Sequence, residues 1–156
     1  MKKIALVLAV LALAGCITTR PMTNIYNPSE YTKYHQAGTA EVKGQAFLKT
    51  AGGEVRFGAG ETVSLIPATA YSEEVIGYIQ NYQFIRPSGV DPRWSEHFKK
   101  TTADGNGNFE FADVPAGTYY LECPIYWMAG DKETGHTVYK KVEVHDGDKI
   151  KVVLTD

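Results

Sequence analysis

The four histidines are the residues best suited to metal or acid-base chemistry, and their spacing forms no recognised site. The sequence contains no His-x-His, His-x-x-x-His or Cys-x-x-Cys pattern of the kind that holds zinc. A fold can join distant residues, for example His97 and His136, but nothing in the sequence indicates that it does. We therefore expect all four to be solvated loop side chains: His35, His97, His136 and His145.

Residues 104–108, Asp-Gly-Asn-Gly-Asn, carry side-chain oxygens at alternate positions, as calcium-binding loops do. They lack the glycine and the terminal glutamate at the offsets of such a loop, and Asp, Asn and Gly also favour tight turns for conformational reasons. No Gly-x-Ser-x-Gly nucleophile elbow is present. The sequence therefore predicts a turn here, and a protein that is not an enzyme and has no metal site and no cofactor.

The N-terminus has the layout of an export signal. It begins Met-Lys-Lys, continues with an apolar run over residues 4–14 that is too short to span a bilayer, and ends Leu-Ala-Gly-Cys16. This ending is similar to the lipobox of bacterial lipoproteins, in which the signal is cut before the cysteine and the thiol carries a diacylglyceryl group. The resemblance implies that residues 1–15 are a cleaved signal peptide and that Cys16 is a lipid (palmitate) anchor in the membrane.

Ile17 follows the cysteine where lipoproteins kept at the inner membrane often carry Asp. The resemblance therefore implies the outer membrane of a Gram-negative cell envelope. Removal of the signal leaves an excess of acidic residues, so charge gives no reason to expect nucleic acid as a partner. With Cys16 lipidated, Cys123 is the single remaining thiol, so the fold must rely on apolar packing instead of disulfides.

Apolar residues alternate along most of the chain from Glu41 to Leu154, which predicts β-strands. We expect a polar turn at residues 129–135, and a strand that is an edge or bulged at Pro124, which cannot donate to a ladder. The Asp-Gly in residues 145–148 predicts a hairpin between the last two strands. The strands expected lie at residues 41–49, 55–57, 62–67, 109–111, 119–127, 138–144 and 150–154.

Residues 104–121 follow the pattern Asp-x-x-Gly-x-Phe-x-Phe-x-x-Val-Pro-x-Gly-x-Tyr-x-Leu, and residues 59–67 follow Ala-Gly-x-x-Val-x-Leu-x-Pro. Both resemble the motifs of carboxypeptidase regulatory-like domains, which are small prealbumin-like or Cna-B-like sandwiches and mostly non-catalytic. The resemblance implies an all-β Greek-key sandwich of about seven strands over residues 40–156.

Residues 70–100 break the strand pattern and read as an insertion. Ser72 can cap a helix whose first turn carries Glu73 and Glu74, and apolar residues recur at helical spacing up to Tyr82. The rest of the insertion is a long loop, and long loops in compact domains are usually functional or disordered.

Residues 16–39, between the anchor and the first expected strand, are polar. We interpret them as a tether that is partly docked through its tyrosines.

Four aromatic residues are candidates for binding a partner, because aromatic faces suit sugar stacking and protein contacts. The alternative for the tryptophan, which we favour, is that it pins the insertion to the sandwich. The candidates are Trp94, Tyr82, Tyr78 and Tyr126.

The sequence thus predicts a non-enzymatic lipoprotein of the cell envelope. The leading hypothesis is a structural module that presents the insertion to an envelope protein partner. The alternative is binding of carbohydrate or peptidoglycan through exposed aromatic rings.

Overall fold

The computed structural model describes residues 18–81 and 85–156. The predicted signal peptide, Cys16 and Tyr82 lie outside the described residues. The elements are β1 (Thr18–Pro21), η1 (Pro28–His35), β2 (Ala40–Lys49), β3 (Val55–Phe57), β4 (Thr62–Pro67), α1 (Ala70–Asn81), β5 (Ile85–Ser88), η2 (Pro92–His97), β6 (Lys99–Thr102), β7 (Asn108–Val114), β8 (Gly117–Ala129), β9 (Lys132–Val144) and β10 (Lys149–Leu154).

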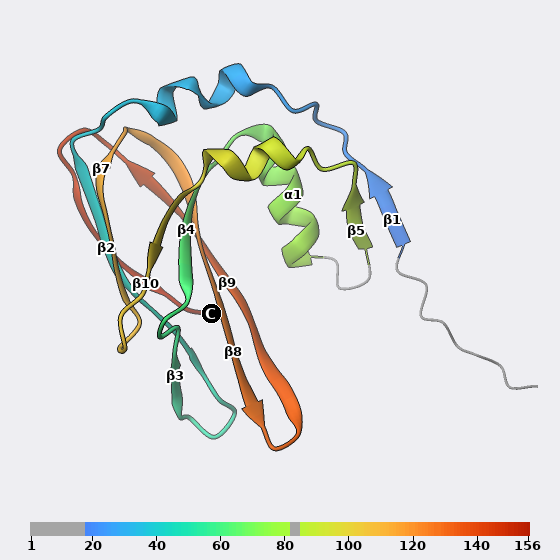
Figure 1. Ribbon diagram of the computed structural model, residues 1–156, viewed down its shortest axis with the longest axis vertical. Helices are drawn as coiled ribbons and strands as arrows, with labels where there is room; N and C mark the ends of the chain where they lie inside the picture. Colours follow the sequence, from blue (N-terminus) through green and yellow to red (C-terminus); the bar gives the residue numbers. More distant parts are fainter. Residues whose placement is uncertain (1–17, 82–84) are drawn as a thin grey trace, which may run out of the picture.

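Two sheets form the body of the molecule (Figure 1). One has the strand order β6-β4-β8-β9, and all its neighbours are antiparallel. In the other, β2 pairs with β10 in parallel on one side, while β7 and then β3 pair with it in antiparallel fashion on the other. The predicted all-β sandwich with one short inserted helix is confirmed.

The core lies between the inward faces of the two sheets. Strand alternation places Val42, Ala46 and Leu48 of β2 there, opposite the inward residues of β8. The inward face of β8 is formed by alternate residues, and Tyr119, Leu121, Cys123 and Ile125 are all buried. Burial raises the pKa of the Cys123 thiol to about 12, which keeps it in the neutral form.

The predicted hairpin between the last two strands is wrong. β9 pairs along its whole length with β8, from Gly117↔Val144 to Ala129↔Lys132, whereas β10 pairs with β2 in the other sheet. The Asp-Gly turn therefore carries the chain from one sheet to the other. The predicted polar turn at residues 129–135 is also narrower, because β9 already begins at Lys132.

Pro124 lies where β8 has a neighbour on one side alone. The pairing of β8 with β4 ends at Ser64↔Glu122, whereas its pairing with β9 continues through Pro124↔Thr137. A residue without an N–H is tolerated at such a position because no ladder bond is lost. The expectation that the strand is an edge at this proline is confirmed.

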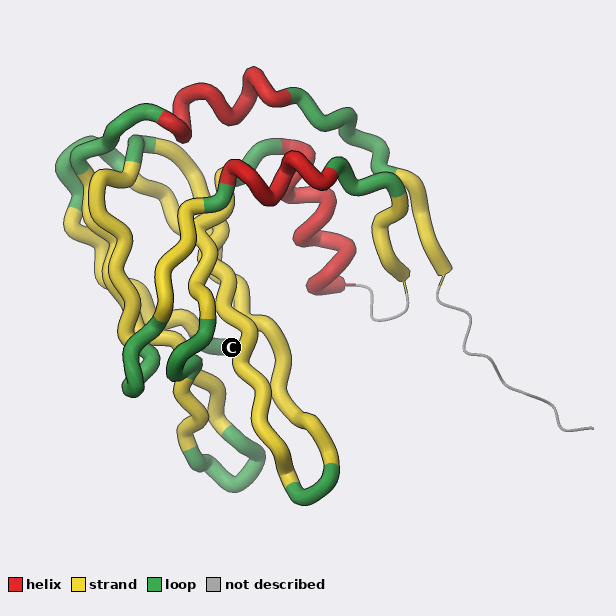
Figure 2. The backbone as a smooth tube through the Cα atoms, in the orientation of Figure 1, coloured by secondary structure: helices red, strands yellow, loops and turns green. Residues whose placement is uncertain are grey.

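The segment of residues 18–39, which we call the strap, runs across the insertion and over one end of the sandwich (Figure 2). β1 pairs in parallel with β5, from Thr18↔Ile85 to Pro21↔Ser88. Glu74 of α1 then accepts hydrogen bonds from the backbone N–H groups of Thr23 (2.6 Å) and Asn24 (2.7 Å). The strap is thus docked along its length, more extensively than the sequence suggested.

Candidate functional site

A groove of about 570 Å³ lies between the C-terminal end of α1 and the β8–β9 pair. We call it the α1 groove. It contains one large exposed aromatic ring, several hydroxyl, amide and imidazole groups, and the end of the chain. Its lining residues are Ile79, Gln80, Tyr126, His136, Thr137, Val138, Tyr139, Thr155 and Asp156.

The position of α1 on the sheet creates one wall of this groove. The helix buries Val75 and Ile76, and Lys141 of β9 donates a hydrogen bond to Glu73 in its first turn. That bond raises the pKa of Lys141, so the lysine stays charged. Ile79, one turn further along, remains 43% exposed and forms the apolar edge of the groove.

Tyr126 forms the opposite wall. Outward-facing positions alternate along β8, and Tyr126 is 49% exposed because no strand or helix covers it. Its hydroxyl lies 3.5 Å from Thr137 Oγ1 on the neighbouring strand. No other hydrogen bond of this hydroxyl occurs among the described residues, so the hydroxyl remains available to a ligand.

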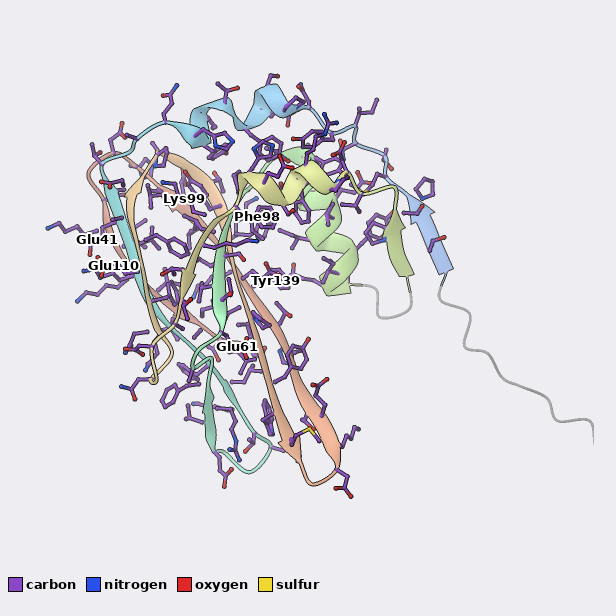
Figure 3. The ribbon with its side chains drawn as sticks, viewed as in Figure 1. Glu41, Glu61, Phe98, Lys99, Glu110 and Tyr139 are labelled. Carbon is purple, nitrogen blue, oxygen red and sulfur yellow. The ribbon has the colours of Figure 1, made fainter. Side chains whose placement is uncertain are left out.

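Polar groups surround this ring. His136 Nε2 lies 2.7 Å from Asp156 Oδ1. The hydroxyl of Tyr139 donates to Glu122 at 2.9 Å, and burial together with that carboxylate raises the pKa of Tyr139 above its usual range. Figure 3 shows Tyr139 beside the helix. A ring face next to hydroxyl, amide and imidazole groups suits a ligand that is apolar on one face and polar at its edges.

Of the predicted binding residues that the structure describes, Tyr126 is the one that lines this groove. Trp94 is half-buried: its indole N–H donates to Ser72 Oγ at 2.8 Å, and its ring meets Phe98 edge to face with centroids 4.8 Å apart. These contacts hold Trp94 against α1 and Phe98, which both belong to the insertion, whereas the favoured alternative had Trp94 pinning the insertion to the sandwich. Tyr78 lines a separate hollow of about 290 Å³ with Arg20 and Glu74.

The structure brings His35 and His97 together, which the sequence did not indicate. His35 Nε2 lies 2.6 Å from His97 Nδ1, and His97 Nε2 lies 2.5 Å from the hydroxyl of Tyr26. Tyr31 stacks on the His97 ring with centroids 4.0 Å apart. Burial lowers the pKa of His97, and so does the neighbouring His35, so the neutral imidazole is favoured.

The contact between these two histidines links the strap to η2, whereas we expected both to be solvated loop side chains. The expectation of solvated loop histidines is therefore wrong for His97, which is only partly exposed. Both of its ring nitrogens already have partners within the protein. Within residues 18–81 and 85–156 no three His, Cys, Asp or Glu side chains lie close enough together to hold a metal ion.

The Asp104 turn has the conformation that the sequence predicted. Asp104 Oδ1 accepts the backbone N–H groups of Asn106 (2.8 Å) and Asn108 (2.9 Å). The side-chain amide of Asn108 also bonds to this carboxylate and is the main reason that the pKa of Asp104 is lowered. The carboxylate is therefore used to stabilise the turn.

No helix in the described part of the chain is long and apolar enough to cross a membrane.

No protein-family model matches this sequence, and no curated protein matches it. The predicted resemblance to carboxypeptidase regulatory-like domains therefore stays a prediction. Among solved structures, the chain is similar to PA1324 from Pseudomonas aeruginosa, which is described as a candidate carbohydrate-binding protein. The two are 30% identical with a TM-score of 0.71, over 84% of this chain and 97% of PA1324.

A second solved structure is a variant of BcpA, the major pilin subunit of Bacillus cereus. It is 12% identical with a TM-score of 0.42, over 76% of this chain and 30% of that one. At this TM-score the match carries no argument about this protein.

Proposed function

Because this chain belongs to the family of PA1324 from Pseudomonas aeruginosa, we propose that it is a non-enzymatic carbohydrate-binding protein of the cell envelope. One observation carries the proposal: the α1 groove combines the half-exposed ring of Tyr126 with groups that donate and accept hydrogen bonds. The description of PA1324 as a candidate carbohydrate-binding protein gives independent support to the proposal.

The chemistry of the lining favours a neutral sugar. A pyranose offers an apolar face of C–H groups and a rim of hydroxyls, which matches the Tyr126 ring and the side chains of Gln80 and Thr137. Among the residues whose side chains the structure describes, no lysine or arginine lines the α1 groove, so these residues offer no permanent cation that would select a carboxylate or a phosphate.

The insertion is less suited to be the binding face for an envelope protein partner. Two of its large rings are engaged inside the molecule: the Tyr71 hydroxyl accepts the backbone N–H of Asp91 at 2.6 Å, and the indole N–H of Trp94 donates to Ser72. Exposed aromatic anchors are what usually dominates a protein interface. We therefore place the binding function in the α1 groove, to which the insertion contributes the α1 wall, instead of on the loop that follows α1.

Binding to immobilised neutral oligosaccharides and to peptidoglycan tests this function. We expect Tyr126→Ala to weaken saccharide binding about tenfold or more, which corresponds to ~1.4 kcal/mol, because the stacking face is lost. Tyr126→Phe keeps the ring and should retain most of the affinity. The readout is the dissociation constant from isothermal titration calorimetry.

Met128→Ala is the matched control, since Met128 lies on the same strand and face, is 62% exposed and does not line the groove. It should bind as the wild type does. If the wild-type protein retains no saccharide, or if Tyr126→Ala binds as tightly as Met128→Ala, the α1 groove is not a carbohydrate site.

We also propose that a lipid on Cys16 anchors the protein in the outer membrane. The export signal ending at this cysteine supports the anchor. Thr18, two residues after Cys16, is already paired with Ile85, so the anchor would hold the domain close to the membrane surface. Cys16→Ser should move the protein from the membrane fraction to the soluble fraction, and unchanged membrane retention would exclude lipidation as the anchor.

A further inference from the structure

A second groove, of about 580 Å³, lies on the other sheet, beside the connection between β6 and β7. We call it the lysine groove. Its lining comes from neighbouring positions on β10, β2 and β7: Lys43 has Lys151 and Glu110 as cross-strand neighbours, and Gln45 has Asn108. The lining residues are Lys43, Gly44, Gln45, Thr101, Thr102, Asp104, Asn108, Phe109, Glu110, Lys151 and Val152.

The two lysines of this groove differ in their charge partners. Lys43 forms ion pairs with Glu41 and, at 3.3 Å, with Glu110. Figure 3 shows these two glutamates close together on the sheet. Lys151 forms no ion pair with any residue in the described part of the chain.

Lys43 is already compensated by its two glutamates, so Lys151 is the lysine of this cross-strand pair that lacks a counter-charge among the described residues. An anion bound at Lys151 would supply that counter-charge. The two acidic groups that line the groove do not supply it. Glu110 is paired with Lys43, and the Asp104 carboxylate is held by the turn.

Neutral hydrogen-bonding groups complete the lining. The hydroxyls of Thr101 and Thr102 have no side-chain partner among the described residues. Gln45 uses its amide nitrogen to bond to the carbonyl of Asn106 at 2.9 Å, which leaves its amide oxygen available. The groove therefore presents one uncompensated cation beside several groups that recognise hydroxyls.

We propose that the lysine groove binds an acidic sugar, with the sugar carboxylate at Lys151 and the sugar hydroxyls at Thr101, Thr102 and Gln45. A single negative charge fits better than a phosphate dianion, because Glu110 and Asp104 would repel a second charge. This inference extends the proposed carbohydrate-binding function to a second site of opposite charge preference. The α1 groove takes a neutral sugar and the lysine groove an acidic one.

A matched pair of ligands tests the charge requirement. The full soluble chain with Cys16→Ser is titrated with trigalacturonic acid and with its methyl ester, which has the same sugar skeleton without the charges. We expect the acid to bind about tenfold or more tightly than the ester, and this preference to fall as salt screens the lysine. Equal binding of acid and ester by the wild-type protein overturns the proposal.

Variants then place the binding at the lysine groove. Lys151→Ala should lose the preference for the acid, whereas Lys151→Arg should keep it. Lys149→Ala is the control, because Lys149 lies on the same strand and face, has Glu41 as its cross-strand neighbour and does not line the groove. If Lys151→Ala keeps the full preference, the site lies elsewhere.

The two sites can fail separately. Loss of neutral-sugar binding in Tyr126→Ala with an unaffected acid preference in Lys151→Ala would support the α1 groove and refute the lysine groove. A Lys151-dependent preference for the acid without any binding of neutral sugars would refute the α1 groove and leave the lysine groove supported.

Discussion

Replacement of Tyr31 by alanine is expected to lower the free energy of unfolding by about 3–5 kcal/mol, the usual cost of removing a large buried ring. The side chain is 0% exposed although it belongs to the strap. Its ring stacks on His97, and its hydroxyl is bonded to Thr69 Oγ1 at 2.8 Å and Ser72 Oγ at 3.2 Å. Alanine would leave a cavity and two buried hydroxyls with fewer partners, which urea unfolding followed by tyrosine and tryptophan fluorescence can measure.

Tyr31→Phe separates packing from hydrogen bonding. It keeps the ring and removes the hydroxyl, so we expect a loss of about 0.5–1.5 kcal/mol. Burial raises the pKa of the Tyr31 hydroxyl, whereas its hydrogen bonds with Ser72 and Thr69 lower it. Burial is the larger effect, so the pKa is raised overall. If Tyr31→Ala unfolds at the same urea concentration as the wild type, the strap is a loose tether and its docked position is wrong.

The sandwich could be predicted because most of its strands show their burial in a local alternation of apolar and polar residues. In β7 the alternation of Phe109 and Phe111 with Glu110 follows directly from one face packing on the core and the other facing water. The pairing of β9 and β10 could not be predicted in the same way. A turn sequence shows that the chain reverses, but not whether the next strand joins the same sheet or the facing one.

The candidate site was predictable in part for the same reason. Tyr126 was identified because alternation along β8 places it outward, and exposure on a strand needs no knowledge of distant residues. Trp94 was open to two interpretations because its burial depends on Ser72, which lies 22 residues earlier on α1. The contact between His35 and His97 joins residues 62 apart, at the ends of η1 and η2, and no local sequence pattern indicates such a contact.

The second large effect is expected where the strap passes the end of β7. A Cβ atom at Gly38 would lie 2.0 Å from the carbonyl carbon and oxygen of Val114 and 2.1 Å from the nitrogen of Pro115. All three are backbone atoms, so no side-chain rotation can make room. The chain is held close here by the hydrogen bond from the Gly38 N–H to the carbonyl of Asp113 at 3.2 Å. We expect Gly38→Ala to destabilise the fold by about 3 kcal/mol, the upper end of the cost of overpacking.

Gly77→Ala is the control that separates this clash from the general effect of replacing glycine. Gly77 lies inside α1, and a Cβ atom there meets nothing within 4 Å. Alanine favours the helix over glycine, so this variant should gain about 0.5–1 kcal/mol in the free energy of unfolding. Opposite signs for the two variants in thermal unfolding would therefore show that the strap is pressed against the sheet at Gly38. A melting temperature of Gly38→Ala at or above that of the wild type would mean that the strap does not approach the Val114 backbone. The docked position of the strap, and with it the contacts of Tyr31, would then be wrong.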